Sequence, residues 1–448
     1  MDKIEVKKLL IEDKCIKVVF DTSDSLKQYF KSNAFEINYS VSIENVPYSI
    51  AVIPFVCNVL PIVWMTNAEL IVDTLDADFL RCIDEVKNGF SQIHEIELNG
   101  KLSCKTEENT IHSTRSMAFF SGGVDAVATV LAHIDEKPSL FTIWGADVKY
   151  DDVPAWQNID SQVQGVCKTL DLDSISCRTN FRAFIDEDSC SLLMRQCGTE
   201  PQWWLGFQSG IGLIGHAAPV AYKYGYKNIY IGSSYTMATR GQVRDASDPR
   251  TDGKMAFCGA QVYHDQFEFN RQQKLQHIVE FVNRTNIKIP LRVCWQSWSG
   301  KNCCHCEKCY RTICGLVAEG ANPNDYGFPM TNHDIQRMQF ELRNVYHLST
   351  MQQIFWKEIK ERINTNTALE IPRQYRWLTN FSIVNSFAPK SIFSKFCRFI
   401  TRRDNIANRV IIAFINIVRG GGIIIGVCDE EDKMFINNDS FKYYHTIL

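Results

Sequence analysis

A pair of adjacent glycines between an apolar run and an amphipathic run restricts the fold of this chain more than any other feature. Residues 117–120 (Met-Ala-Phe-Phe) are apolar, Ser121-Gly122-Gly123-Val124-Asp125 follows, and residues 126–133 have helical spacing. This order predicts a strand, a tight turn and the start of a helix, because glycine lets the backbone turn sharply and approach a ligand closely. The first-turn amides of a helix are unpaired and lie at the positive end of its dipole. The sequence therefore predicts a phosphate-binding turn.

Asp125 restricts the class of ligand that this turn is expected to bind. A carboxylate beside bare phosphates is repelled unless a cation lies between them, so the turn favours a nucleoside triphosphate with Mg²⁺. No Gly-Lys-Ser/Thr follows the glycines, which excludes a Walker loop, and the stretch does not contain the G-x-G-x-x-G of dinucleotide folds. An ordinary strand–helix turn with a surface aspartate is the alternative that this stretch alone leaves open.

Composition favours a reducing compartment. The 448 residues are 45% hydrophobic and carry a net charge of −3, which predicts more than one domain and no global basic field for nucleic acid. Seventeen cysteines, many in apolar segments, favour the cytoplasm with buried thiols and a metal site over a disulfide framework. The charged residues 1–5 lack a signal-peptide core, and the apolar run 410–418 is too short to span a bilayer, so no transmembrane segment is expected.

Periodicity divides the chain into three expected regions. Residues 1–112 form short alternating or apolar runs, including 48–56, and predict the hairpins of an N-terminal α+β domain with a helix at 77–90. Residues 113–324 predict an α/β domain with a parallel sheet, and residues 325–448 a helical C-terminal region. The elements expected in the parallel region are strands at 117–120, 139–144, 174–178 and 228–231, and helices at 126–133, 155–170 and 203–224.

Four cysteines with the spacing C-x8-C-x2-C-x2-C predict a metal centre: Cys294, Cys303, Cys306 and Cys309. Two thiolates separated by two residues can turn back on one metal, and four thiolates form a closed tetrahedral Zn²⁺ site with a structural role. The neighbouring Cys304 and His305 are competing ligands, although Cys304 breaks the two-residue spacing. Buried cysteines without a metal are the alternative, which the polar neighbours of these cysteines oppose.

The carboxyl ends of the other expected strands supply further candidate residues, because parallel sheets bind ligands at that edge. Gly145 follows the second strand, where main-chain atoms would suit an adenine ring. Gly232 and Ser233 follow the fourth strand, where an acceptor pocket is expected.

Cations downstream of the fourth strand are candidates for phosphate contacts. Arg271 and Lys274 are three residues apart on a predicted helix and share one face, so they either bind ligand or form salt bridges on the helix. A loop with Arg240, Arg244 and Lys254 is expected to close on pyrophosphate, or else to be an ordinary surface loop.

Ser-Gly-Gly-x-Asp resembles the PP-loop of the ATP pyrophosphatase (adenine nucleotide alpha-hydrolase-like) superfamily, except that the final serine of that motif is Ala126 here. The loop followed about 170 residues later by the four-cysteine pattern is similar to the 7-cyano-7-deazaguanine synthase family over residues 117–318. The resemblance implies cleavage of ATP to AMP and pyrophosphate, with Mg²⁺ at Asp125 and Zn²⁺ on the four cysteines. The implied nucleotide loop contains Phe120, Ser121, Gly122, Gly123, Val124, Asp125 and Ala126.

The resemblance therefore implies an enzyme that adenylates an acceptor carboxylate or carbonyl and then inserts nitrogen to give an amide or nitrile. The expected catalytic residues are Ser121, Asp125, Arg271 and Lys274. The residues outside 117–318 are not covered by the resemblance, and the chain looks more like the extended relatives found in bacterial antiphage and other accessory gene clusters. The acceptor is accordingly expected to be a deazapurine or a macromolecule.

Several alternatives stay open at this point. A nucleotide-binding scaffold without turnover is favoured by Ala126, and a sulfur-inserting enzyme of the tRNA-thiolation type would use Cys190 or Cys197 as its thiol. Residues 1–110 and 325–448 are expected to face protein partners, or else to pack over the core and close the pocket. The basic segment 390–419 is expected to be a solvated helix face rather than a membrane or nucleic-acid patch.

Overall fold

The computed structural model describes residues 1–297, 299–344, 346, 348–366 and 369–381, and the backbone of three strands between residues 412 and 435. The chain divides into two compact units: Met1–Met330 with Ile354–Arg373, and Thr331–Gln353 with Gln374–Leu448. The lysines and arginines of the basic segment 390–419 lie outside the described residues. No helix in the described part of the chain is long and apolar enough to cross a membrane.

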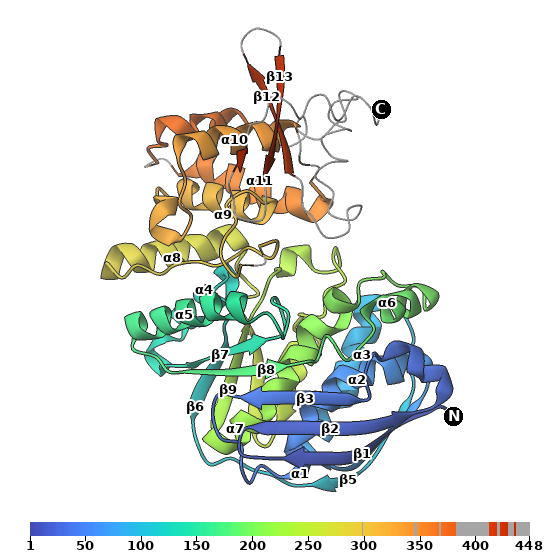
Figure 1. The fold of residues 1–448 in the computed structure, drawn as a ribbon. Coiled ribbons are helices and arrows are strands. Elements are labelled where there is room, and N and C mark those ends of the chain that lie inside the picture. The colour runs from blue at the N-terminus through green and yellow to red at the C-terminus, as the bar shows by residue number, and fades with distance from the viewer. Residues whose placement is uncertain are drawn as a thin grey trace. The chain divides into compact units, whose positions relative to one another are not determined.

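The first unit is built on one sheet of eleven strands, in the order β10-β11-β9-β6-β7-β8-β3-β2-β1-β4-β5 (Figure 1). The strands are β1 (Lys3–Ile11), β2 (Cys15–Thr22), β3 (Ala34–Tyr39), β4 (Glu69–Asp76), β5 (Lys101–Glu107), β6 (Arg115–Phe119), β7 (Ser139–Trp144), β8 (Ser174–Thr179), β9 (Tyr226–Gly232), β10 (Ala256–Phe257) and β11 (Ala260–Asp265). The block β11-β9-β6-β7-β8 is parallel throughout, which confirms the parallel sheet predicted for this region.

Helices lie on both faces of the sheet, with α4 and α5 on one face and α2 and α7 on the other (Figure 1). The helices of the first unit are α1 (Tyr48–Ala51), α2 (Ile53–Thr66), α3 (Ala77–His94), α4 (Val124–Ala132), α5 (Val153–Leu170), α6 (Glu187–Gln196), α7 (Ala218–Tyr224), α8 (Arg271–Thr285), α9 (Glu307–Ala318) and most of α11 (Thr350–Thr365). Short turns of 3₁₀-helix cover Asp24–Tyr29, Ile134–Glu136, Gly215–Ala217, Met237–Thr239, Asp252–Lys254 and Pro323–Tyr326.

The strand order reverses beside β6. The chain runs from β6 to β7 and β8 on one side and then returns to place β9 on the other side of β6. In doubly wound sheets, the crevice for ligands forms outside the carboxyl ends of the strands at such a switch point. The turn after β6 and the residues after β9 are therefore placed at the edge where this architecture binds ligands.

The N-terminal strands continue the same sheet. β3 pairs antiparallel with β8, with Ile37 opposite Thr179, and this pairing joins β1–β5 to the parallel block. The boundary predicted at residues 112/113 therefore does not coincide with a division of the structure, because both sides of it belong to the first unit. Periodicity within 1–112 identified strands there but carried no information on their distant partner.

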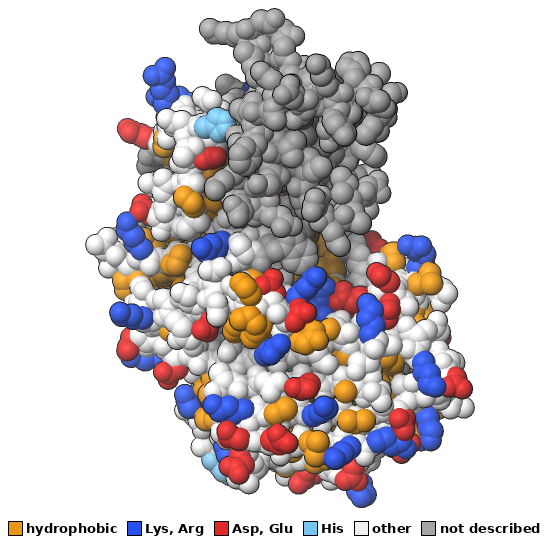
Figure 2. Space-filling view, in the orientation of Figure 1, with side chains coloured by type: hydrophobic (Ala, Val, Ile, Leu, Met, Phe, Trp, Pro, Cys, Tyr) orange, Lys and Arg blue, Asp and Glu red, His pale blue; other side chains and the backbone are white. Residues whose placement is uncertain are grey.

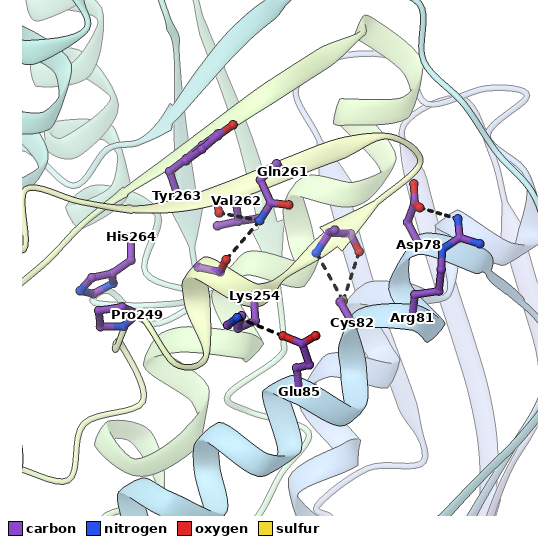
Figure 3. A pocket seen from close by; sticks show the side chains of 12 residues that line it. Asp78, Arg81, Cys82, Glu85, Pro249, Lys254, Gln261, Val262, Tyr263 and His264 are labelled. Carbon is purple, nitrogen blue, oxygen red and sulfur yellow. Dashed lines mark hydrogen bonds and ion pairs between the residues drawn. The ribbon is translucent and has the colours of Figure 1, made fainter.

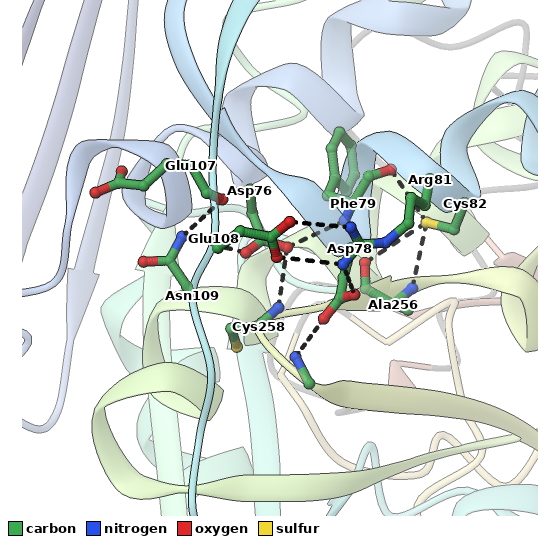
Figure 4. A network of polar contacts seen from close by, with 11 residues as sticks. Asp76, Asp78, Phe79, Arg81, Cys82, Glu107, Glu108, Asn109, Ala256 and Cys258 are labelled. Atoms are coloured by element: carbon green, nitrogen blue, oxygen red, sulfur yellow. Dashed lines mark hydrogen bonds and ion pairs between the residues drawn. The ribbon is translucent and has the colours of Figure 1, made fainter.

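A polar network also ties the N-terminal region to the β10–β11 hairpin (Figure 4). Asp76 caps α3 by accepting a hydrogen bond from the Phe79 amide at 3.0 Å, and the same oxygen accepts the Cys258 amide at 3.0 Å. Its other oxygen accepts from the Asn109 side chain at 3.2 Å. Asp76 is fully buried, so these bonds offset the cost of removing its carboxyl group from water.

Two expectations about local structure were wrong. The apolar run 48–56, predicted as part of a hairpin, forms α1 and the beginning of α2, whose residues are buried on almost every side. Short apolar runs do not distinguish a buried strand from a buried helix. The helix predicted at 203–224 is three pieces: a π-helix at Trp204–Gly212, a 3₁₀ turn and α7. Gly212 and Gly215 lie against α2 there, where a Cβ on either would come within 2.8 Å of α2 side-chain atoms.

The second unit contains α10 (Asn332–Asn344) and most of the 3₁₀-helix Arg373–Asn380. It also contains an antiparallel sheet of β12 (Ile412–Val418), β13 (Gly422–Cys428) and β14 (Met434–Phe435). The helical prediction for 325–448 thus holds for α10 and α11 and is corrected by these strands. On the face shown in Figure 2, basic and acidic side chains of the described residues are interspersed, in keeping with the small net charge.

Candidate functional site

The predicted strand, turn and helix are present as β6, residues 120–123 and α4. Gly122 has φ +77°, a left-handed conformation that side chains resist, so glycine is needed at this position. Gly123 is the N-cap of α4, and no side chain caps this helix. The amides of its first turn are therefore not taken by a capping side chain, which leaves them for a ligand. Ser121 is exposed, and its hydroxyl accepts a hydrogen bond from the Gly123 amide at 3.4 Å.

Asp125, on the first turn of α4, is held by two cations of α8. Its Oδ2 lies 2.7 Å from Nη1 of Arg271, and its Oδ1 lies 3.7 Å from Nζ of Lys274. Asn270 caps α8 through a reciprocal pair of bonds with Gln273, which places Arg271 and Lys274 on the first turn. The expectation that these two cations share a face is confirmed, and the structure brings both to the predicted turn.

Lys274 connects Asp125 to the end of β9. Its ammonium donates to the backbone oxygen of Ser233 at 2.5 Å and to the Ser233 hydroxyl at 2.8 Å. The lysine side chain is 1% exposed. Gly232 packs directly on α4, because a Cβ there would lie 2.7 Å from the carbonyl oxygen of Asp125. Gly232 and Ser233, predicted from the strand end alone, therefore belong to the same site as the turn.

Nearby charges and burial have opposite effects on the pKa values of Asp125 and Lys274. Burial alone would raise the pKa of Asp125, but the nearby charges of Arg271, Lys274 and Lys308 lower it below its usual value. Burial lowers the pKa of Lys274, and the charge of Asp125 counteracts this change. Oδ1 of Asp125 and Nε of Arg271 are buried and make no hydrogen bond. Unsatisfied buried polar atoms are rare in folded proteins, so these two atoms make the position a candidate ligand site.

Helix α9 adds two cations, Lys308 and Arg311. The Lys308 charge acts on Asp125, and burial among cations lowers the pKa of both residues. Arg311 lies 3.6 Å from Glu307 and its guanidinium stacks on the ring of Phe355, 4.4 Å from the centroid. Spacing along the sequence does not assign Lys308 and Arg311 to the phosphate site, because their positions depend on where the cysteines place the start of α9.

Helix α11 packs beside the site from a position more than 200 residues after the turn. Phe355 lies over Arg311 and 6.3 Å from the ring of Tyr235, which follows β9. Trp356 donates to Glu307 at 2.9 Å, and Arg362 forms a salt bridge with Glu319 at 2.7 Å. The part of the C-terminal region from Ile354 therefore covers α9, in agreement with the alternative that this region packs over the core.

The four predicted cysteines come together. Their Sγ atoms all lie within 4.8 Å of one another, with Cys294–Cys306 and Cys303–Cys309 at 3.9 Å. A tetrahedral Zn²⁺ with bonds of about 2.3 Å requires thiolates about 3.8 Å apart. Backbone amides of Ser297, Cys306 and Cys309 donate to these sulfurs at 3.2–3.4 Å, as expected for thiolates. The residues present therefore fit one zinc ion.

The two competing ligands point elsewhere. His305 bonds through Nδ1 to the backbone oxygen of Cys303 at 2.6 Å. Cys304 has φ +56° and its thiol points to the backbone oxygen of Asn302. Neither belongs to the metal-binding group found among the described residues.

Arg292 was not identified from the sequence, although it makes several contacts to the turn. Its amide donates to the Gly122 oxygen at 2.7 Å, and its Nε donates to the Ser121 oxygen at 3.0 Å. Its Nη2 lies 3.1 Å from Oδ2 of Asp147, which follows β7. An isolated arginine 170 residues away from the turn carries no sequence signal for such a contact.

The remaining predicted residues make contacts within the protein. Gly145 has φ +122° and packs against the Thr179 backbone, where a Cβ would lie 2.2 Å from oxygen; it shapes the end of β7. Two cations of the predicted closing loop are paired away from Asp125: Arg244 with Glu95 at 2.6 Å and Lys254 with Glu85 at 3.0 Å. Lys254 lines a hollow of about 670 Å³ between α3 and β11, where Figure 3 shows its contact with Glu85.

Neither of the proposed catalytic thiols is suited to attack. Cys190 is fully buried, and burial raises its pKa well above the usual value. Burial also raises the pKa of Cys197, whose thiol points to the Met65 backbone oxygen at 3.9 Å. A reactive cysteine needs a lowered pKa and access to substrate.

Comparison of the chain with protein-family models and with curated proteins finds no match.

Proposed function

We propose that this protein is an ATP-dependent enzyme that adenylates an acceptor oxygen, releases pyrophosphate and then joins nitrogen to the activated carbon. One observation carries the proposal: the first turns of α4, α8 and α9 meet around Asp125 at the switch point of the sheet. The first turn of α4 contributes uncapped amides, α8 contributes Arg271 and Lys274, and α9 contributes Lys308. Several cations and oriented amides gathered around the carboxylate of Asp125 match a triphosphate accompanied by a metal ion.

The turn amides, Asp125 and the three cations have separate roles in the proposed reaction. The turn amides would hold the phosphates, and Asp125 would hold Mg²⁺, which would offset negative charge on the triphosphate. Arg271, Lys274 and Lys308 would stabilise the pyrophosphate as it leaves. The acceptor oxygen attacks the α-phosphorus and its carbon becomes activated by AMP. Attack by an amine on that carbon then expels AMP and yields an amide.

The acceptor is inferred from the resemblance to the deazaguanine synthases. We propose a carboxylate or carbonyl of a deazapurine or of a macromolecule, taken up beside Ser233 at the end of β9, in a pathway of bacterial defence. Dehydration of the amide to a nitrile would need a second activation by the same site. Ammonia would come from solution, from a partner protein or from an amine on the substrate itself.

A nucleotide-binding scaffold without turnover is the second candidate. The ion pairs of Asp125 with Arg271 and Lys274 favour it, because these cations compete with a metal ion for the carboxylate. The buried Ala126 also lacks the hydroxyl found at that position of the PP-loop. The sulfur-inserting alternative is disfavoured by the buried thiol of Cys190 and the raised pKa of Cys197.

Pyrophosphate release from ATP separates the enzyme from the scaffold. Asp125→Asn should abolish release while the protein stays folded and binds zinc, because the substitution keeps the size of the side chain. Asp135→Asn, which alters an exposed carboxyl in the 3₁₀ turn Ile134–Glu136 that follows α4, is the matched control and should retain full release. A wild-type chain that binds ATP tightly and never releases pyrophosphate would support the scaffold instead.

A further inference from the structure

Arg292 lies beside the turn that follows β6, and its amide, Nε and Nη2 donate to other groups of the protein. The residue is 6% exposed. Its amide and Nε hold the backbone oxygens of Gly122 and Ser121, and its guanidinium also contacts Asp147. The Cβ that glycine lacks at position 122 would lie 3.2 Å from Cβ of Arg292, so the two backbones are in close contact. These contacts fix the shape of the turn and leave the phosphate side of the turn to other cations.

The same short segment enters the metal centre. Cys294, a predicted zinc ligand, follows Arg292 by two residues. Asn302, which precedes the ligand Cys303, accepts hydrogen bonds from the amides of Val293 and Cys294 at 2.9 and 3.3 Å. It also donates to the Leu291 oxygen at 2.7 Å. Residues 291–294 are therefore held by the turn on one side and by the cysteine cluster on the other.

We propose that Arg292 is a positioning residue that couples the four-cysteine metal centre to the phosphate-binding turn, so that zinc and ATP each strengthen the binding of the other. This inference rests on the proposed function, because it requires a turn that binds ATP. When zinc leaves, Cys294 loses its anchor and the segment 291–294 is free to shift. The turn then loses the donors that hold the backbone oxygens of Ser121 and Gly122, and its amides no longer converge.

The proposed coupling is tested by measuring the effect of zinc on ATP binding and the effect of ATP on zinc binding. If zinc raises the affinity for ATP by some factor, ATP must raise the affinity for zinc by the same factor. The dissociation constant of ATP is measured on zinc-loaded and zinc-depleted protein, and that of zinc by equilibrium competition with a chelator, with and without saturating Mg²⁺-ATP. For the wild-type chain we expect both factors to be equal and about fivefold or larger.

Arg292→Met should keep one zinc per chain and lose most of this coupling. Arg284→Met, an exposed arginine near the end of α8, is the matched control and should couple like wild type. Asp147→Asn tests the same contact without touching the zinc segment, and should reduce the coupling to an intermediate value. It remains informative if Arg292→Met fails to fold.

The salt dependence of ATP binding shows whether Arg292 positions the turn or contacts phosphate directly. Removing a cation that binds phosphate makes ATP binding less sensitive to ionic strength. Arg271→Met should show this reduced sensitivity, whereas Arg292→Met should bind ATP more weakly with the sensitivity of wild type. Full coupling in Arg292→Met, or a salt dependence reduced as in Arg271→Met, would overturn the inference. A wild-type chain that binds no ATP would remove the proposed function itself, which is a separate failure.

Discussion

Replacing Gly232 by alanine should disturb the phosphate-binding turn from the neighbouring strand. The new Cβ would lie 2.7 Å from the carbonyl oxygen of Asp125 and 2.9 Å from Oγ1 of Thr129. Ordinary contacts begin at 3.4 Å, so the first turn of α4 must move by about 0.7 Å. Overpacking of this kind costs about 1–3 kcal/mol in stability. A displacement near 1 Å in a catalytic site costs about 100-fold in rate, so we expect a loss of about tenfold or more.

The measurement pairs thermal unfolding with the rate of pyrophosphate release. Gly165→Ala is the matched control, because Gly165 lies within α5 and a Cβ there would meet nothing within 4 Å. Alanine is favoured over glycine inside a helix by about 0.5–1 kcal/mol, so this control should be at least as stable and as active as wild type. The reasoning is refuted if Gly232→Ala retains both the stability and the rate of the Gly165→Ala protein.

The zinc centre, the hydrogen bonds of His133 and the ring of Phe355 give three further predictions. Metal analysis should find one zinc per chain, and Cys306→Ala should lose the metal and become protease-sensitive, because structural zinc supplies folding energy and Cys306 also caps α9; a stable, zinc-free wild-type protein would contradict this. Burial lowers the pKa of His133, but hydrogen bonds to Asp265 and Glu136 outweigh it and leave the pKa raised. The stability that His133 adds is therefore complete below the pKa of the unfolded chain and lost as the pH rises through the raised value, so His133→Gln should be more destabilising at pH 6 than at pH 9 in denaturant titrations. Phe355→Ala removes the ring that stacks on Arg311 and should weaken ATP binding several-fold, by about 1 kcal/mol, whereas the exposed Lys357→Ala should not.

Features encoded over a short stretch were predicted well. The strand, turn and helix around Gly122 and Gly123 are determined by residues 117–133, and the cysteine cluster by residues 294–309. Arg271 and Lys274 were also placed on one helical face, because i and i+3 positions are neighbours on any helix. Each of these inferences needed only local spacing.

Features that depend on distant pairing were not predicted. Nothing in the periodicity of β3 shows that it pairs with β8, some 140 residues later, so residues 1–112 were taken for a separate domain. Arg292 became a candidate only when the fold placed it against Ser121 and Gly122. The strands β12–β14 were missed because the apolar run 410–418 sits among basic residues that suggested an amphipathic helix.

The products of ATP turnover test the central claim most directly. Mg²⁺-ATP is incubated with wild-type and Asp125→Asn proteins, with ammonium and with or without a deazapurine carboxylate, and the nucleotides and phosphates are separated. The proposal predicts AMP and pyrophosphate in equal amounts from the wild-type chain and neither from Asp125→Asn, although both proteins bind zinc. Formation of ADP with inorganic phosphate, or equal product formation by Asp125→Asn, would contradict it.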